Sequence, residues 1–287
     1  MGIDIHTLNF LRNAKKKKPF GETVTIGRQG LHASEHRVKE LVGTKSTYKN
    51  QVYCEELLTE YFGATNVESI DNSDYEKATR IHNMNEPLPQ NLCGKFDTVI
   101  DGGCLEHIFN VPQAFKNCSL LCKQGGQILH ILPANNFCGH GFWQFSPELF
   151  FALYSTENGY EETEVFLADL FDRDKWYQVQ KPTNGKRVNI KSSDALYVLV
   201  RTVLKKTNFA HINVQQSDYV YEWNRTTPMP EPTPSKGHVG FILFLIKIPF
   251  VYKLLSPIYH LYLRANSGDK LDGKNPELSV ITVKTYI

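Results

Sequence analysis

The sequence has little net charge. Its 287 residues include 32 Lys and Arg against 30 Asp and Glu, which leaves a formal net charge of +2. A protein that binds the phosphate backbone of nucleic acid usually carries a clear excess of positive charge. The one dense basic run, residues 15–18, is predicted to be the solvated end of an N-terminal helix, with contact to an anionic surface as the alternative. We therefore expect no nucleic-acid partner.

The sequence also lacks a CxxC pair, although it has six cysteines. In its first eighteen residues the positive charge follows the apolar stretch, whereas a secretory signal has the opposite order. We therefore expect reduced thiols and a cytoplasmic protein. His32 and His36 have the spacing of two ligands on one helix face, but no third ligand stands at a recognisable distance. The sequence thus predicts no metal site.

No apolar run is long and uninterrupted enough for a transmembrane helix. The most apolar stretch, residues 241–264, is broken by Lys247, Pro249, Lys253 and Pro257, and a span needs about twenty apolar residues. We expect this stretch to pack on the main domain as a helical appendage. A peripheral membrane contact is the alternative, because aromatic side chains alternate there with basic ones.

Strand and helix patterns alternate over most of the chain. This alternation predicts an α/β fold with a doubly wound, Rossmann-like, mostly parallel sheet and helices on both faces. The division is an N-terminal helix in 1–20, the main domain in 21–206 and a C-terminal appendage in 207–287. Strands are predicted at 22–27, 67–71, 81–85, 96–101, 127–132 and, at the far edge of the sheet, 195–203; helices are predicted at 5–16, 48–63, 75–82, 111–121 and 146–160.

The residues that directly follow the predicted strands form a chemically suggestive set. In such a sheet, a ligand binds outside the carboxyl ends of the strands. Glycine allows close approach to the backbone, a carboxylate can accept both hydroxyls of a ribose, and an amide can pair with an adenine edge. The four groups are Gly27 to Gly30, Asp71 to Ser73, Asn83 to Asn85, and Asp101 to Gly103.

The run FDTVIDGGCLEHIF, followed by LLCKQGGQILHILP, resembles the core of class I S-adenosylmethionine-dependent methyltransferases. The resemblance extends over about residues 22–203 and includes the acidic end of the second strand. Within that family the chain is most similar to methyltransferase-domain proteins of bacterial sugar and polysaccharide pathways. In those proteins, a strand ending in LGRQ replaces the usual glycine-rich signature.

The resemblance implies a set of residues that bind S-adenosylmethionine. Gly27 would lie under the methionine part, flanked by Arg28 and Gln29, and Asp71 would accept the ribose hydroxyls unless it caps a helix. The adenine would be bound by Asn83 and Met84, and the sulfonium end by Asp101 and Gly102.

Methyl transfer to oxygen or nitrogen requires a positioned acceptor and removal of its proton. His107 in the LEH motif and His140 in the loop after the fifth strand are the candidate bases, since histidine titrates near neutral pH. His130, inside that strand, is predicted to be a core histidine. Side chains of the same loop could stack on and hydrogen-bond a polar acceptor: Asn135, Asn136, Trp143 and Gln144.

One departure from the family pattern keeps a second function open. The segment VTIGRQGLH lacks the usual GxGxG loop, and residues 30–50 are longer than usual, which predicts a lid or substrate-binding insert. The leading prediction is an enzyme that methylates an oxygen of a small molecule such as a sugar or glycan precursor. The alternative is a non-catalytic binding or scaffolding module with the same fold. A dinucleotide oxidoreductase fits less well, since GxGxxG is missing.

Overall fold

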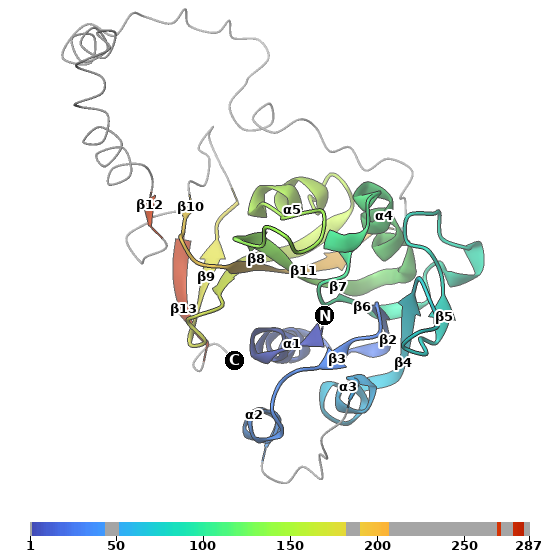
Figure 1. Cartoon of the computed structure of the whole chain (residues 1–287). Helices are drawn as coiled ribbons and strands as arrows, with labels where there is room; N and C mark the ends of the chain where they lie inside the picture. Colours follow the sequence, from blue (N-terminus) through green and yellow to red (C-terminus); the bar gives the residue numbers. More distant parts are fainter. Residues whose placement is uncertain (1, 44–51, 182–189, 207–268, 271–277, 284–287) are drawn as a thin grey trace, which may run out of the picture.

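The computed structural model describes residues 2–43, 52–181, 190–206, 269–270 and 278–283. Its centre is a nine-stranded sheet with the order β13-β9-β8-β11-β7-β6-β2-β4-β5. Figure 1 shows this sheet crossing the molecule from β13 to β5. The strands are β2 (Gly21–Ile26), β4 (Ala64–Asp71), β5 (Arg80–Ile81), β6 (Phe96–Asp101), β7 (Cys122–Asn135), β8 (Tyr160–Asp169), β9 (Lys175–Val179), β11 (Leu196–Leu204) and β13 (Leu278–Thr282).

One half of the sheet is parallel. Strands β5, β4, β2, β6 and β7 pair parallel with their neighbours. The chain runs from β2 outward to β4 and β5, then returns across the sheet to β6 and β7. The strand order therefore reverses between β2 and β6, and a crevice for a ligand is expected outside their carboxyl ends.

The other half of the sheet is antiparallel. Strand β11 lies between β7 and β8 and pairs antiparallel with both, and β9 and β13 continue the same pattern. The sheet is thus mixed, and the prediction of a mostly parallel sheet was too simple. The prediction that residues 195–203 form the far edge was wrong, because β8, β9 and β13 lie beyond β11.

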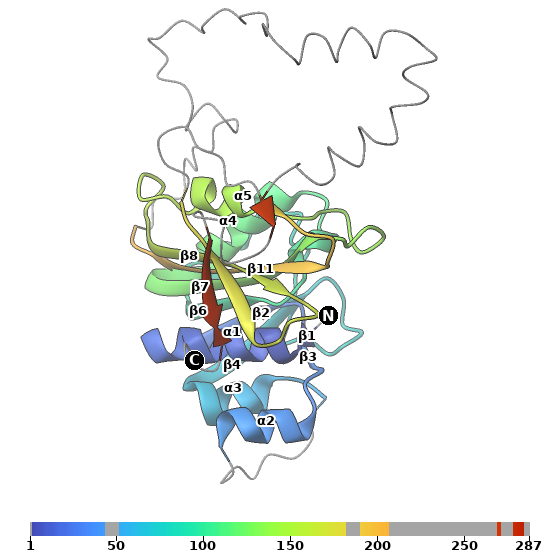
Figure 2. The ribbon, with the colours of Figure 1, turned by 90° about the vertical axis from the view of Figure 1, so that its left-hand side faces the viewer.

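Helices lie above and below the sheet as it is drawn in Figures 1 and 2. Helices α4 (Val111–Leu121) and α5 (Pro147–Leu153) lie above it, and α1 (Ile5–Lys17), α3 (Glu55–Phe62) and α2 (Glu35–Val42) lie below. Two separate hydrophobic clusters contain the buried side chains of the two layers. The sheet is therefore covered by packed side chains along much of both faces.

Helix α1 agrees with its prediction to within one residue. The Asp4 carboxylate accepts a hydrogen bond of 2.8 Å from the Thr7 amide and caps the first turn. Leu8, Phe10 and Leu11 are fully buried beneath the sheet. Burial of each such side chain contributes about 1.5–3 kcal/mol. The apolar stripe of α1 thus ties the N-terminal segment to the main domain.

Further predictions differ from the structure. The strand expected at 81–85 comprises only Arg80–Ile81, and the helix expected at 146–160 ends at Leu153. Residues 75–82 do not form a helix, since Lys77 has a φ of 55° and the chain turns there into the short strand β5. Strand β13 belongs to the stretch predicted as an appendage, yet it is hydrogen-bonded to β9 within the main sheet. Residues 241–264 lie outside the described part of the chain. In the described part, no helix combines the length and hydrophobicity needed to cross a membrane.

Candidate active site

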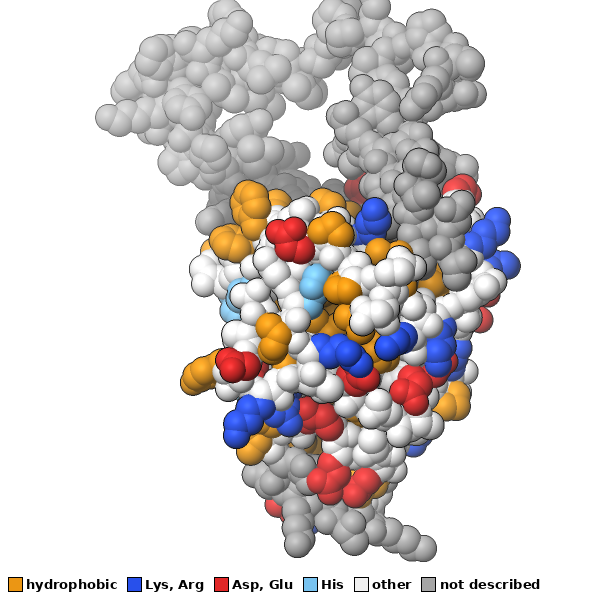
Figure 3. Space-filling view, turned by 90° about the vertical axis from the view of Figure 1, so that its right-hand side faces the viewer, with side chains coloured by type: hydrophobic (Ala, Val, Ile, Leu, Met, Phe, Trp, Pro, Cys, Tyr) orange, Lys and Arg blue, Asp and Glu red, His pale blue; other side chains and the backbone are white. Residues whose placement is uncertain are grey.

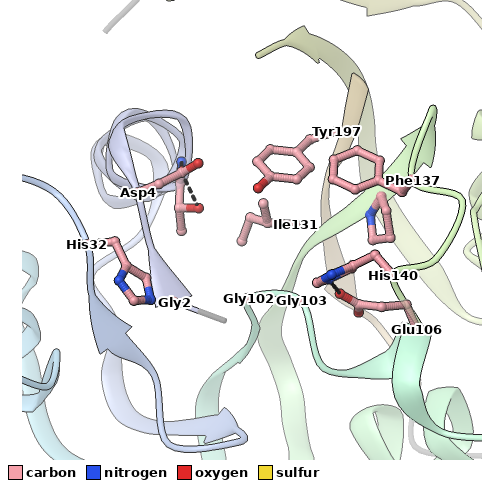
Figure 4. A pocket seen from close by; sticks show the side chains of 12 residues that line it. Gly2, Asp4, His32, Gly102, Gly103, Glu106, Ile131, Phe137, His140 and Tyr197 are labelled. Carbon is pink, nitrogen blue, oxygen red and sulfur yellow. Dashed lines mark hydrogen bonds and ion pairs between the residues drawn. The ribbon is translucent and has the colours of Figure 1, made fainter. Parts of the chain in front are cut away.

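A pocket of about 230 Å³ lies beyond the carboxyl ends of β6 and β7. Figure 4 shows the N-terminal segment on one side of it and the loop that follows β7 on the other. Polar side chains and a glycine contribute to its wall: Asp4, His32, Gly102, Glu106, His140 and Tyr197. The pocket therefore lies at the carboxyl edge of the sheet over β6, β7 and β11, next to the point where the strand order reverses.

The turn after β6 brings the backbone close to this pocket. Gly102 and Gly103 both line it, and Gly103 has a φ of 87°, a conformation that glycine adopts readily. The Asp101 carboxylate accepts hydrogen bonds from the amides of Cys104 (2.9 Å) and Leu105 (3.3 Å). Asp101 thus holds the short turn η2 (Leu105–His107), which carries Glu106 and His107.

The second oxygen of Asp101 points into the core. It lies 2.8 Å from Nδ1 of His130, whose Nε2 lies 2.6 Å from the Tyr154 hydroxyl. Asp101 and His130 are fully buried, and burial raises the pKa of Tyr154. His130 is the satisfied core histidine that the sequence predicted. The carboxylate of Asp101 already has protein partners at both oxygens, so its place in the structure is to position the turn at Gly102.

The loop after β7 is folded back onto η2 by backbone hydrogen bonds. The Glu106 carbonyl accepts from the amides of Phe142 (2.7 Å) and Trp143 (3.2 Å). Gly141 has a φ of 74°, and a Cβ atom there would come within 2.7 Å of the same carbonyl oxygen. Close packing at a glycine therefore brings His140 to the rim of the pocket.

Glu106, His107 and His140 form a cluster at this rim. Glu106 Oε1 lies 3.5 Å from Nε2 of His140 and 3.9 Å from Nε2 of His107. The Glu106 side chain is only 1% exposed. Burial, and to a smaller extent the nearby Asp101 carboxylate, raise its pKa to about 8. Burial and His140 lower the pKa of His107.

The predicted cofactor residues after β2 lie outside the pocket. Arg28 points away from it: its Nε is 2.7 Å from Glu55, and its guanidinium lies 3.9 Å from the centre of the Tyr53 ring. Gln29 is buried and donates to the Ile26 carbonyl at 2.7 Å. A Cβ atom on Gly27 would lie 3.4 Å from Gln29 Nε2, and one on Gly102 would lie 2.6 Å from Gln29 Oε1. The side chain of Gln29 therefore fills the space next to both glycines.

The predicted ribose and adenine residues also lie away from the pocket. Asp71 is half-buried at the end of β4 and accepts long hydrogen bonds (3.4 Å) from the amides of Arg28 and Ser73. No helix begins there, so the alternative that Asp71 caps a helix was wrong. Asn83 accepts from Asn85, while Met84 is buried. The roles of these residues toward a cofactor stay predictions.

The four predicted substrate-binding side chains hold the loop after β7 in place. Asn135 and Asn136 donate to carbonyls of residues 192–194, and the Trp143 indole donates to the Ile108 carbonyl at 3.0 Å. Gln144 accepts from the Phe137 amide at 2.9 Å. None of the four lines the pocket. Their hydrogen bonds therefore position His140, and contact with an acceptor stays a prediction.

Several pocket residues had no signal in the sequence. Strand β1 (Gly2–Ile3) pairs with β3 (Gly30–Leu31) and places Asp4 and His32 at the pocket. Tyr197 reaches it from β11, and burial raises its pKa to about 12. The predicted insert at residues 30–50 does contribute His32, while its residues 44–51 lie outside the described part. Glu106 could have been suspected, because it stands inside the LEH motif.

The strand order and the pocket define an open α/β sheet with a pocket at its carboxyl edge, next to the switch point. No family model matches the chain, and no curated protein matches it.

Similar solved structures include the YcgJ protein of Bacillus subtilis (10% identity, 70% of this chain, 99% of the other, TM-score 0.40). Another is phosphoethanolamine N-methyltransferase 2 of Haemonchus contortus (12% identity, 69% of this chain, 52% of the other, TM-score 0.38). A third is a branched-chain polyamine synthase of Thermus thermophilus (13% identity, 75% of this chain, 60% of the other, TM-score 0.36). These values are too low to assign a family or to transfer an activity to this chain.

Proposed function

We propose that this protein is an S-adenosylmethionine-dependent methyltransferase that methylates an oxygen of a polar small molecule, such as a sugar or glycan precursor. The observation that carries the proposal is the pocket at the carboxyl edge of the sheet, beside its switch point, lined by Gly102, Glu106 and His140. All three come from the segments that carry the family resemblance or directly follow them in the chain.

The sheet order supports the same proposal. From β5 to β8 the order is β5-β4-β2-β6-β7-β11-β8, with β11 antiparallel to both neighbours. This arrangement agrees with the resemblance to class I methyltransferases that the sequence carries. The cofactor would lie across the carboxyl ends of β2, β4 and β6, where Gly27, Asp71 and Gly102 stand.

The pocket wall suits a small polar acceptor. Its volume of about 230 Å³ lies below the range of about 300–1,000 Å³ for drug-sized ligands. Asp4 and His32 face the cluster of Glu106 and His140 across the pocket, and Tyr197 lies beside Phe137 on the side of His140 (Figure 4). These groups could hydrogen-bond several hydroxyls of one molecule. His107 and His140 both remain candidates for accepting the proton, since each lies beside Glu106.

Gln29 favours the second candidate function, a non-catalytic module. Its buried side chain occupies the space beside Gly27 and Gly102, where the resemblance implies the methionine part of the cofactor. A methyltransferase would have to move this side chain on binding. The Gln29→Ala variant distinguishes the two functions: binding of S-adenosylmethionine by the variant and not by the wild type supports the non-catalytic module.

Calorimetric titration with S-adenosylmethionine tests the enzyme proposal. We expect binding by the wild type and at least a tenfold loss for Asp71→Ala, because a carboxylate to the ribose hydroxyls is worth about 1.5–3 kcal/mol. Asp74→Ala is the matched control, since Asp74 is exposed in the same loop. Absence of heat and an unshifted melting temperature at millimolar ligand would refute the proposal.

A further proposal concerns the cellular location of the protein and its contact with membranes. We propose a cytoplasmic protein, with residues 241–264 either packed on the main domain or in peripheral contact with a membrane. On the described surface in Figure 3, basic and acidic side chains are interspersed, in keeping with the net charge of +2. A flotation assay with anionic vesicles would separate the two roles of residues 241–264.

A further inference from the structure

We propose that Glu106, His107 and His140 bind one divalent transition-metal cation at the rim of the pocket. The three side chains each offer one ligand atom, and these atoms all lie within 4.8 Å of one another. No metal site was predicted from the sequence, because His140 comes from the loop after β7 and the other two from the turn η2. The site thus depends on the contact between these two segments.

The distances suit a shared cation. Bonds from Zn²⁺ to nitrogen or oxygen are about 2.0–2.2 Å, so two ligands of one ion lie roughly 3–4 Å apart. Glu106 Oε1 lies 3.5 Å from His140 Nε2 and 3.9 Å from His107 Nε2. The side chains of His107 and His140 are 43% and 46% exposed, so both rings have room to turn toward an ion.

A second observation points to a ligand at the same place. Glu106 is 1% exposed, and its Oε2 atom is buried without a hydrogen-bond partner. Buried carboxylates are normally paired with a cation or fully hydrogen-bonded, since an isolated buried charge is costly. Among the described residues, the basic groups paired with Glu106 are the imidazoles of His107 and His140, both at Oε1. A bound cation would stabilise the ionised form of Glu106 and could be coordinated by one or both of its oxygens.

The ligand set selects a class of cation. Two imidazoles and one carboxylate suit Zn²⁺, Fe²⁺ and related first-row ions, whereas Mg²⁺ and Ca²⁺ prefer oxygen ligands alone. Three protein ligands leave coordination positions open, as catalytic metal sites do. Glu106 and His140 also line the pocket, so an open position would face an acceptor there. The use of the cation in methyl transfer rests on the proposed function, but its binding does not.

Calorimetric titration of the full-length protein with Zn²⁺ and with Mn²⁺, after dialysis against a chelator, tests the proposal. We expect one site per chain for Zn²⁺ and weaker binding of Mn²⁺. His107→Ala and His140→Ala should each lower the affinity about tenfold or more, as loss of a ligand or its support does. His36→Ala is the matched control, because His36 is an exposed histidine outside the cluster. Unchanged binding in both cluster variants would overturn the proposal.

The exposed thiol of Cys138 could bind Zn²⁺ on its own. Titration with Co²⁺ separates the two cases, because thiolate coordination adds a ligand-to-metal charge-transfer band that imidazole and carboxylate ligands lack. We expect no such band, and the same spectrum for Cys138→Ser. A charge-transfer band that disappears in Cys138→Ser would assign the ion to the thiol and reject the cluster.

Two further controls distinguish a loss of metal binding from a loss of folding or of cofactor binding. Circular dichroism and the melting temperature in chelator establish whether each variant is folded. If His107→Ala is not folded, Glu106→Gln, which keeps the size of the side chain, replaces it in the metal titration. The metal titrations contain no S-adenosylmethionine, and the cofactor titration is run in chelator. If no cation binds, cofactor binding can therefore still be measured, and if no cofactor binds, cation binding can still be measured.

Discussion

Glu106 Oε1 lies 3.5 Å from Nε2 of His140, although the two residues come from different turns at the edge of the sheet. The same glutamate binds the loop of His140 through its carbonyl, which accepts from the amides of Phe142 and Trp143. One residue thus contributes a side chain to the cluster and a backbone group to the fold of the neighbouring loop. Any change that moves this loop should alter the cluster.

Gly141→Ala should displace the loop that carries His140. The alanine Cβ would lie 2.7 Å from the Glu106 carbonyl oxygen at a φ of 74°, and we expect a loss of about 1–3 kcal/mol in unfolding free energy. Gly139→Ala is the control, because Gly139 also has a positive φ (91°) but nothing within 4 Å of a Cβ. Chemical denaturation compares the variants. Equal losses would mean that backbone conformation alone, and not the contact with Glu106, limits position 141.

His140→Ala should abolish turnover and spare cofactor binding. As a proton acceptor His140 would contribute a factor of about 10²–10⁴ to the rate. As a ligand of a catalytic metal ion it would also be required for turnover. His36→Ala should retain wild-type turnover. Rates measured with and without a chelator separate the two roles of His140, since only the metal role predicts loss of wild-type activity in chelator. Full activity of His140→Ala would exclude both.

Stability in chelator should fall as the pH rises from about 4.5 to about 8. The ordinary pKa of a glutamate is 4.5, and burial raises that of Glu106 to about 8. Between these values the folded protein binds a proton that the unfolded chain has lost, so higher pH favours unfolding. The difference from this one group is of the order of a few kcal/mol.

Urea denaturation across this pH range measures the effect, with Glu106→Gln as the control. The variant should show a smaller fall, because its side chain does not titrate. Parallel pH profiles of the two proteins would mean that Glu106 has the same pKa folded and unfolded.

Tyr154→Phe should destabilise the core beneath the pocket. The substitution removes the hydroxyl that lies 2.6 Å from Nε2 of His130, at a place where both rings are buried. A buried nitrogen left without a partner costs about 1–3 kcal/mol. Tyr75→Phe should be neutral, since Tyr75 is 90% exposed. Guanidinium unfolding of both variants checks this, and a neutral Tyr154→Phe would show that the hydrogen bond adds nothing to stability.

Phe10→Ala should loosen helix α1 from the sheet. The Phe10 ring is fully buried, with its centroid 6.1 Å from that of Trp176 and 6.3 Å from that of Phe166. Loss of such a side chain costs about 3–5 kcal/mol. Phe109→Ala is the control, because Phe109 is 74% exposed. Thermal melting compares the two, and a Phe10→Ala variant as stable as the control would show that α1 is not anchored through this ring.

The parallel half of the sheet was predictable because its signals are local. The apolar run of residues 96–101 stops at a glycine pair, and the predicted bounds of β6 and α4 match the structure. Helix α3 ends at Gly63, which adopts the left-handed conformation predicted for a C-cap. The antiparallel half was not predictable in this way. Nothing in the sequence of residues 195–203 shows that β11 lies between β7 and β8, which both precede it in the chain.

The candidate site divides along the same line. The sequence predicted roles for Gly102 and His140, because the first follows a clear strand and the second stands in a polar loop. Both residues line the pocket, and their roles stay predictions. It also assigned Asn135, Asn136, Trp143 and Gln144 to a substrate, whereas their side chains bind the loop itself. A polar side chain has the same sequence signal whether its partner is a ligand or a nearby carbonyl.

The sequence by itself determined β2, β4, β6, α4 and β7 and the residues at the ends of these strands, because periodicity and glycine act over a few neighbouring residues; it did not predict β8, β9 or β13. Only the tertiary structure decided that Gln29 fills the space beside Gly27 and Gly102, and that Asp101 faces His130. It also decided the approach of His140 to Glu106. These contacts join segments far apart in the chain, and their geometry follows from how the whole sheet and its loops pack.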